Sequence, residues 1–305
     1  MIIACGMDIG TNSFRLLVAE VRDGCLYPLA HDLITVRLGE GLGASGLLAP
    51  AAMLRAETAL VRFSGIMATY PLHSVRACAT HAVRKATNRE EFLQRAKGLI
   101  GPVEVLSGEE EARLALLGVL SALPEDRQRY PLLMVDVGGG STELVLQATA
   151  GSEPRVLSLP LGAVGLTEEF AANRAAMREK IRATLVPALR SIAAGEMLGQ
   201  GVSLVASGGT ATSLAALALG LDRYDAQQVQ NYQLSQATLD RLVTWLATLS
   251  PTERNGLPGL AEGRGEIIVA GAVLLQELQQ ALASPVLVSD AGLLEGILLS
   301  GTTDS

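Results

Sequence analysis

Residues 4–19 read ACGMDIGTNSFRLLVA and residues 132–147 read LLMVDVGGGSTELVLQ, and these two stretches decide the fold. Four residue types recur in them at the same offsets: Asp8, Gly10, Ser13 and Leu16 in the first, and Asp136, Gly138, Ser141 and Leu144 in the second. In each, an apolar run precedes the aspartate and another follows the serine, which is typical of two strands joined by a tight turn. Two unrelated hairpins with similar turns are the alternative, but four matched positions favour a duplicated unit.

Strands and helices are mixed along the whole chain, which indicates α/β architecture. Apolar spacing predicts long helices over 50–70, 168–192, 236–249 and 267–282, with a kink at Pro187. A polar break at 124–131 is the best candidate for a domain boundary. We therefore expect domain I to comprise residues 1–122 with a return at 290–305, and domain II to comprise residues 125–289.

Composition excludes several classes of protein. Of the 305 residues, 49% are hydrophobic and 18% charged, which is incompatible with a disordered chain. The net charge of 24 − 31 = −7 argues against binding of nucleic acid, which needs a basic surface. The three cysteines have neither disulfide nor zinc spacing. With no spanning segment and no signal peptide in the pattern, a cytoplasmic protein without membrane contact is expected.

The two aspartate turns have the chemistry of a phosphate site. An aspartate at the end of a buried strand is costly unless it binds a cation or accepts hydrogen bonds. Glycine-rich backbone closes around anions through its N–H groups, and hydroxyl side chains add donors. Two such loops facing each other across a cleft would hold a phosphate chain, with Asp8 and Asp136 on a shared divalent cation.

These motifs resemble the phosphate loops of the actin / Hsp70 / sugar-kinase superfold, and in detail the exopolyphosphatase / guanosine pentaphosphate phosphohydrolase (Ppx/GppA) family. The matching stretches are MDIGTNSFRLLVAEV (7–21), VRLGEGL (36–42), ATHAVRKATN (79–88), LSGEEEARLALLGV (106–119), VDVGGGSTELVL (135–146), ASGGTATSLAAL (206–217) and SDAGLLEGIL (289–298). The resemblance implies an α/β fold of two ribonuclease-H-like domains with a cleft between them. It also implies Mg²⁺ or another divalent cation as cofactor.

Two glutamates are the candidate catalytic residues. Ser107 and Glu110 have the spacing of a capping box at the start of a helix, and Glu111 faces the apolar side of that helix, whereas Glu109 can pair with Arg113. A capping-region glutamate that favours the helix dipole is an equal alternative for Glu111 from spacing alone. The resemblance implies that Glu111 acts on the attacking water.

Glu143, read from position alone, is a solvated strand-edge residue. The resemblance implies instead that it assists Glu111 and holds the water or the metal, so the implied metal ligands are Asp8, Asp136 and Glu143.

Phosphate-binding residues are expected in both turns and in a basic segment. The loop residues are Thr11, Asn12 and Ser13 in the first turn, and Gly138, Gly139, Gly140, Ser141 and Thr142 in the second. Segment 76–97 carries six Lys or Arg against Glu90 and Glu91, a local +4 that is otherwise a solvated helix face. The resemblance singles out Arg84 as a phosphate contact.

Further residues of the family's ligand cleft match Arg15, Arg264 and the turn Ser207, Gly208, Gly209 and Thr210. That turn follows a predicted strand and precedes a helix, which suits an anion, although a helix start that needs small residues explains it equally. The chain departs from the family pattern at His81, Glu266 and Leu294, which affects the expected recognition of the distal ligand end. The Gly-x-Gly-x-x-Gly at 41–46 lacks a strand–helix crossover and is expected to be a flexible cleft loop.

We predict an exopolyphosphatase that releases orthophosphate from inorganic polyphosphate. Guanosine pentaphosphate hydrolysis, which belongs to the stringent response, and a non-catalytic sensor of guanosine tetra- or pentaphosphate are the alternatives. A sugar or acetate kinase on the same superfold would need an acceptor pocket with an aspartate base, and no such motif occurs. The oligomeric state is left open, with a homodimer as one option.

Overall fold

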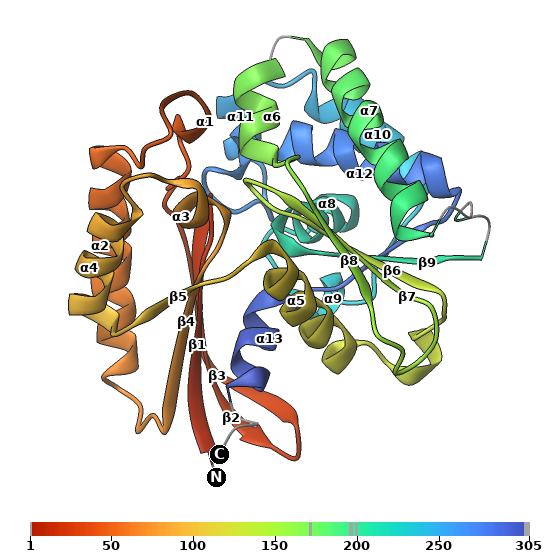
Figure 1. Ribbon diagram of the computed structural model, residues 1–305. Helices are drawn as coiled ribbons and strands as arrows, with labels where there is room; N and C mark the ends of the chain where they lie inside the picture. Colours follow the sequence, from red (N-terminus) through yellow and green to blue (C-terminus); the bar gives the residue numbers. More distant parts are fainter. Residues whose placement is uncertain (1, 171–172, 195–197, 199–200, 302–305) are drawn as a thin grey trace. The chain divides into compact units, whose positions relative to one another are not determined.

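The computed structural model describes residues 2–170, 173–194, 198 and 201–301. The chain forms two compact units: unit 1 is Met1–Ser121 with Gly292–Ser305, and unit 2 is Ala122–Ala291. Each unit has its own mixed β-sheet flanked by helices (Figure 1). The domain limits expected from the sequence stay a prediction.

Unit 1 is built on a five-stranded sheet in the order β3-β2-β1-β4-β5. Strands β3, β2 and β1 are antiparallel neighbours, whereas β4 and β5 continue the sheet in parallel. The strands are β1 (Ile2–Ile9), β2 (Ser13–Arg22), β3 (Cys25–Thr35), β4 (Ser74–Ala79) and β5 (Val103–Val105). The helices are α1 (Leu42–Ser45), α2 (Pro50–Met67), α3 (His81–Lys85), α4 (Arg89–Ile100), α5 (Gly108–Ala122) and α13 (Leu293–Ser300).

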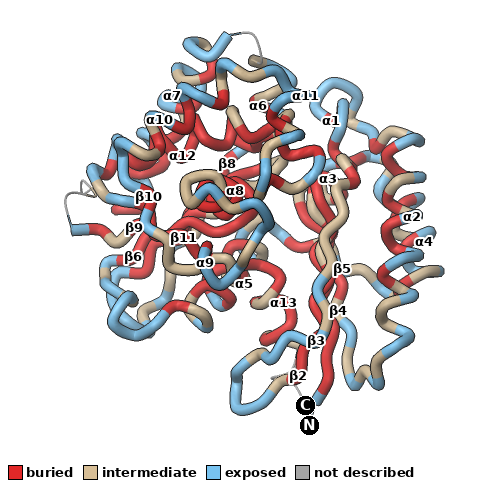
Figure 2. The backbone as a smooth tube through the Cα atoms, turned by 180° about the vertical axis from the view of Figure 1, so that it is seen from behind, coloured by how far each residue is buried: buried red, intermediate tan, exposed pale blue. Residues whose placement is uncertain are grey.

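Alternation along β1 gives this sheet two apolar faces. Met7 and Ile9 belong to the core shared with Phe63 of α2 and Phe92 of α4. Ala4 instead joins Leu298 of α13 on the other face. Because both faces are covered, β1 is buried almost from end to end (Figure 2), and Asp8 at its carboxyl end is held within the sheet.

Unit 2 repeats the same strand order in its own six-stranded sheet, β10-β11-β9-β6-β7-β8. Strands β6, β7 and β8 are antiparallel neighbours, β6, β9 and β11 are parallel, and β10 adds an antiparallel edge. The strands are β6 (Leu132–Val137), β7 (Thr142–Gln147), β8 (Arg155–Leu159), β9 (Ser203–Ser207), β10 (Gln233–Leu234) and β11 (Val286–Val288). The helices are η1 (Glu125–Arg127), α6 (Ala163–Phe170), α7 (Arg174–Ile192), α8 (Gly208–Leu219), α9 (Ala226–Val229), α10 (Gln236–Leu246), α11 (Pro251–Asn255), η2 (Arg264–Glu266) and α12 (Ile268–Leu282).

The predicted pair of aspartate hairpins is confirmed by the strand register. Asp8 lies opposite Arg15 in the first hairpin, and Asp136 lies opposite Glu143 in the second. In both turns the glycine N–H donates to the serine carbonyl, at 3.2 Å from Gly10 to Ser13 and 3.0 Å in the second copy. The two copies thus share one backbone, while the residue facing the aspartate is basic in one and acidic in the other.

The structure corrects two local predictions. Residues 168–192 do not form one helix: α6 ends at Phe170 and α7 begins at Arg174, with Asn173 capping α7 through its side chain. Residues 171–172 of that prediction lie outside the described chain, and Pro187 is inside α7. The 41–46 segment is not an open loop, because Gly41 and Gly46 adopt left-handed φ angles of 70° and 68° and bound the one-turn helix α1.

No helix within residues 2–170, 173–194 and 201–301 is both long and apolar enough to cross a bilayer.

Candidate phosphate-binding and catalytic site

The first aspartate loop is held from behind by the segment that follows β3. The Asn12 carbonyl accepts hydrogen bonds from the N–H groups of Val36 and Arg37, at 2.9 and 2.8 Å. The Thr11 carbonyl accepts one from Gly39 at 2.9 Å. A side chain at Gly39 would overlap the methyl group of Thr11, so glycine is required there. The loop Thr11–Ser13 is therefore buried and fixed before any ligand arrives.

The second loop has the same kind of support from the start of α6. Gly138 and Gly139 accept hydrogen bonds at their carbonyls from Ala163 and Val164, at 3.0 and 2.8 Å. Gly162 packs so closely on this loop that a Cβ there would overlap the Gly139 carbonyl. Sequence reasoning missed Gly162, because nothing local marks it as a partner of a loop more than twenty residues earlier.

A row of polar side chains crosses the sheet of unit 2 at the level of Asp136. Asp136 pairs with Ser207 of β9 on one side and with Glu143 of β7 on the other, and Glu143 pairs with Ser158 of β8. Ser207 Oγ donates to Asp136 Oδ2 at 3.2 Å, and Ser158 Oγ donates to Glu143 Oε1 at 2.9 Å. Glu143 is only 2% exposed, so it is not a solvated edge residue. Each carboxylate is oriented by a serine hydroxyl from the next strand.

The Ser207–Thr210 turn lies against both Asp136 and Arg264, an arginine predicted to lie in the ligand cleft. Gly208 has a φ of 79° and lies against Asp136, so any side chain there would be strained and would overlap the carboxylate. The guanidinium of Arg264 lies directly on Gly209, where a Cβ would overlap it. Thr210 Oγ1 donates to the Val137 carbonyl at 3.2 Å and fixes the start of α8 on β6. Arg264 is 8% exposed, so turn and arginine form one buried assembly.

Glu111 and Arg84 meet in unit 1, although 27 residues separate them. The predicted capping box is confirmed: Glu110 N donates to Ser107 Oγ at 3.1 Å, and Ser107 N donates to Glu110 Oε2 at 2.8 Å. Glu111 directly follows Glu110 on α5. Arg84 Nη1 lies 3.0 Å from Glu111 Oε2 and also donates to the Leu106 carbonyl at 2.6 Å. The two predicted residues are therefore parts of one ion pair.

The basic segment 76–97 is less cationic than its composition indicates. Its arginines each contact a carboxylate: Arg76 with Glu104, Arg84 with Glu111, Arg89 with Glu90, and Arg95 with Glu57 and Glu91. These glutamates include three that lie outside the counted segment. The local surplus of +4 is thus largely neutralised, and Arg84 stands out because its partner is itself a candidate site residue.

The three departures from the family pattern have different surroundings. Leu294 is 2% exposed and packs with Ala4, Leu17, Ala19 and Leu298, so this position is core. Burial, together with Arg84 and Lys85, lowers the pKa of His81 to about 4, which keeps its imidazole neutral at pH 7. Glu266 ends the short helix η2 that begins at Arg264.

The donor set suits a hard cation. Asp8 is 8% exposed, and Asp136 and Glu143 face each other across two strands. In the described part of the chain, no three or more His, Cys, Asp or Glu side chains are grouped as a metal site. Mg²⁺ is commonly held by one or two carboxylates while phosphate oxygens and water complete its coordination, and the neighbouring carboxylates Asp136 and Glu143 of unit 2 have that chemistry.

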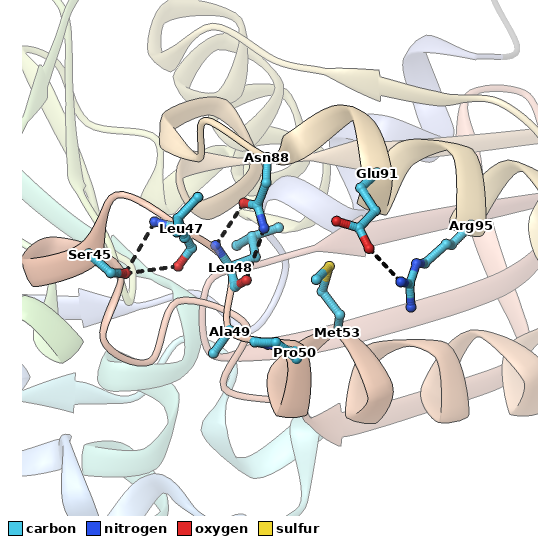
Figure 3. A pocket seen from close by; sticks show the side chains of 9 residues that line it. All are labelled: Ser45, Leu47, Leu48, Ala49, Pro50, Met53, Asn88, Glu91 and Arg95. Carbon is cyan, nitrogen blue, oxygen red and sulfur yellow. Dashed lines mark hydrogen bonds and ion pairs between the residues drawn. The ribbon is translucent and has the colours of Figure 1, made fainter.

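A cavity of about 410 Å³ lies elsewhere in unit 1, between the start of α2 and α4 (Figure 3). Its lining is Ser45, Leu47, Leu48, Ala49, Pro50, Met53, Asn88, Glu91 and Arg95. Asn88 holds Leu48 through both of that residue's backbone groups, at 2.9 and 3.0 Å, and Arg95 is paired with Glu91. The lining includes none of the predicted site residues.

Known proteins are similar to this chain along most of its length. The model of the Ppx/GppA phosphatase family matches residues 17–304. The chain belongs to the Ppx/GppA phosphatase family. It is 33% identical to exopolyphosphatase 2 of Mycobacterium tuberculosis, over 96% of this chain and 97% of that protein. Family membership confirms the predicted enzyme class, a phosphoanhydride hydrolase.

Solved structures of the Ppx/GppA family confirm the fold. The crystal structure of an exopolyphosphatase-like protein has a TM-score of 0.89 at 30% identity and covers 98% of this chain and 97% of its own. A Ppx/GppA member from Aquifex aeolicus has a TM-score of 0.78 at 30% identity, with 98% and 97% covered. An exopolyphosphatase from Cytophaga hutchinsonii reaches 0.86 at 26% identity, with 96% of each chain covered. The predicted α/β fold of the Ppx/GppA family is correct.

Proposed function

We propose that this chain is an exopolyphosphatase that hydrolyses the terminal phosphoanhydride of inorganic polyphosphate and releases orthophosphate, with Mg²⁺ as cofactor. The observation that carries the proposal is the repeated aspartate hairpin, with a preformed loop after each aspartate. The chain belongs to a phosphatase family and is similar to a relative named exopolyphosphatase 2, which supports polyphosphate as the substrate.

Phosphate binding is assigned to groups that are already rigid. The loops Thr11–Ser13 and Gly138–Thr142 have carbonyls engaged by neighbouring backbone, so they need little ordering when a phosphate binds. Arg15 and Arg264 add positive charge, which a net-negative protein must concentrate where a polyanion binds, and Arg84 adds a guanidinium that Glu111 partly compensates. Phosphoryl transfer needs mainly positioning and charge neutralisation, which such groups supply.

Glu111 and Glu143 are the proposed catalytic carboxylates, which align and deprotonate the attacking water. Arg84 contacts Oε2 of Glu111, and Ser158 donates to Oε1 of Glu143, so each carboxylate is oriented by a neighbouring side chain. Asp8 and Asp136, with Glu143, would hold Mg²⁺, which neutralises charge on the phosphate oxygens. Ser207 orients Asp136 for that role.

The test compares two glutamates of one helix. Glu111→Gln should lower phosphate release from polyphosphate by about 10²–10⁴-fold, the usual contribution of a general base, with binding largely retained. Glu109→Gln is the matched control, because Glu109 is an exposed partner of Arg113 on α5. Full activity in Glu111→Gln would refute the assigned role.

Guanosine pentaphosphate is the second candidate substrate, because Arg264 and the 207–210 turn form a buried cationic assembly beside the phosphate loop. The same phosphate-release assay, run with short polyphosphate, long polyphosphate and guanosine pentaphosphate, ranks the three by kcat/KM. Tight binding of guanosine tetra- or pentaphosphate without any phosphate release would instead select a sensor.

A further inference from the structure

Arg254 is a buried arginine that the site described above does not use. It lies on the short helix α11 of unit 2 (Figure 1). Its side chain is buried, at 8% exposure. Its Nε is buried and donates no hydrogen bond to any residue of the described chain. Burial lowers the pKa of this guanidinium, with the charge of Glu266 acting in the opposite direction. A buried guanidinium whose Nε donates no hydrogen bond is costly, so the retention of this arginine calls for an explanation.

The position of Arg254 is set by contacts that do not involve its side chain. Ser250 and Glu253 form a capping box at the start of α11. Asn255 Oδ1 accepts a hydrogen bond from the Gly265 N–H at 2.8 Å, which joins α11 to η2. A Cβ on Gly265 would come within 2.8 Å of the Arg254 carbonyl carbon, so the two short helices are in backbone contact. Arg254 is thus held beside η2 whether or not its guanidinium is bound.

Helix η2 supplies a second buried guanidinium in the same region of unit 2. Arg264 begins η2 and is also 8% exposed. Glu266, at the end of η2, is close enough for its negative charge to raise the pKa of Arg254. Two buried guanidinium groups thus lie on elements that are in backbone contact, in a chain whose overall charge is −7.

We propose that Arg254 binds a phosphate group, in a subsite beside η2 that adjoins the Arg264 assembly. The guanidinium has five donors in a planar fork that matches phosphate oxygens, and the buried Nε of Arg254 donates to no residue of the described chain. The choice of ligand class rests on the proposed function: the phosphate belongs to the same polyanion that the aspartate loops bind. Arg254 is a substrate-anchoring residue away from the reacting phosphate.

The experiment measures binding of tripolyphosphate by calorimetry to the full chain, with EDTA present to prevent turnover. Charged hydrogen bonds contribute about 1.5–3 kcal/mol, so Arg254→Met should weaken binding about ten- to hundredfold. Arg254→Lys keeps the charge without the fork and should lose less. Arg241→Met is the control, because it removes an exposed cation from α10 of the same unit.

Thermal unfolding without any anion separates binding from packing. The Arg254→Met chain should melt at or above the wild-type temperature, since it loses no Nε hydrogen bond and no longer buries a cation. A lower melting temperature with unchanged tripolyphosphate affinity would show a structural role and overturn the proposal. Wild-type affinity in Arg254→Met, or no binding by the wild-type chain, would overturn it as well.

The tripolyphosphate-binding result for Arg254→Met can be interpreted separately from the phosphate-release result. A wild-type chain that releases no phosphate with Mg²⁺, but loses tripolyphosphate affinity through Arg254→Met, would remove the proposed activity and keep this subsite. Normal hydrolysis by the wild-type chain, with wild-type tripolyphosphate affinity in Arg254→Met, would keep the proposed activity and remove this subsite.

Discussion

Gly118→Ala should destabilise unit 1, although alanine is the better helix former. Gly118 lies inside α5, and a Cβ built there would stand 1.8 Å from the Gly292 carbonyl oxygen and 2.9 Å from the Gly296 nitrogen. Real Cβ contacts essentially never fall below 3.0 Å, so the backbones must separate by at least 3.0 − 1.8 = 1.2 Å. Overpacking of this kind costs about 1–3 kcal/mol or more, against about 1 kcal/mol gained in helix propensity.

The difference is an expected loss of about 0–2 kcal/mol in the free energy of unfolding, which denaturant titration followed by far-UV circular dichroism measures. Gly98→Ala in α4 is the matched control, because nothing lies within 4 Å of a Cβ there and propensity alone should stabilise it by about 0.5–1 kcal/mol. Glu111 is two turns from Gly118, so a shifted α5 should also lower turnover, about 10²-fold for a 1 Å misplacement. Equal or greater stability of Gly118→Ala than of Gly98→Ala would refute the steric reasoning.

Two further predictions concern titratable groups. Because the pKa of His81 falls from 6.5 to about 4 on folding, the unfolded chain binds the extra proton between those pH values, and stability should decline as pH falls through that window. His81→Gln should flatten the stability profile there in urea titrations from pH 7 to 4, and an unchanged slope would contradict the assignment. Burial raises the thiol pKa of Cys5 and Cys78 to about 12, so iodoacetamide should label the exposed Cys25 alone in the native chain, as read by mass spectrometry. Rapid native labelling of Cys5 or Cys78 would show that these thiols are accessible.

Features with local causes were predictable from the sequence. The aspartate hairpins follow from strand periodicity and turn residues within sixteen positions, and the Ser107–Glu110 capping box follows from spacing alone. Glu111 was found on the apolar side of its helix by the same kind of counting. The placement of these groups in a Ppx/GppA fold needed the resemblance, because a local pattern does not specify how strands order in a sheet.

Features that depend on distant contacts were not predictable. Gly162 and Gly118 are conspicuous only once the backbone that approaches them is known. Apart from Asn173, the sequence between α6 and α7 has no residue typical of a helix end. The apolar spacing therefore predicted one continuous helix there. Arg254 looks like an ordinary exposed residue in the stretch PTERNG, and its burial becomes evident only from the packing of α11 on η2.

The opposite charges at Arg15 and Glu143 carry a consequence for how such a chain can arise. One hairpin backbone appears twice, and the position facing the aspartate is cationic in one copy and anionic in the other. A symmetric pair of identical half-length chains would have to place the same side chain at both positions, and so would attract a polyanion twice or repel it twice. Within one polypeptide each copy can carry a different side chain at this position, which allows the roles proposed for Arg15 in holding the anion and for Glu143 in handling the water to be separate.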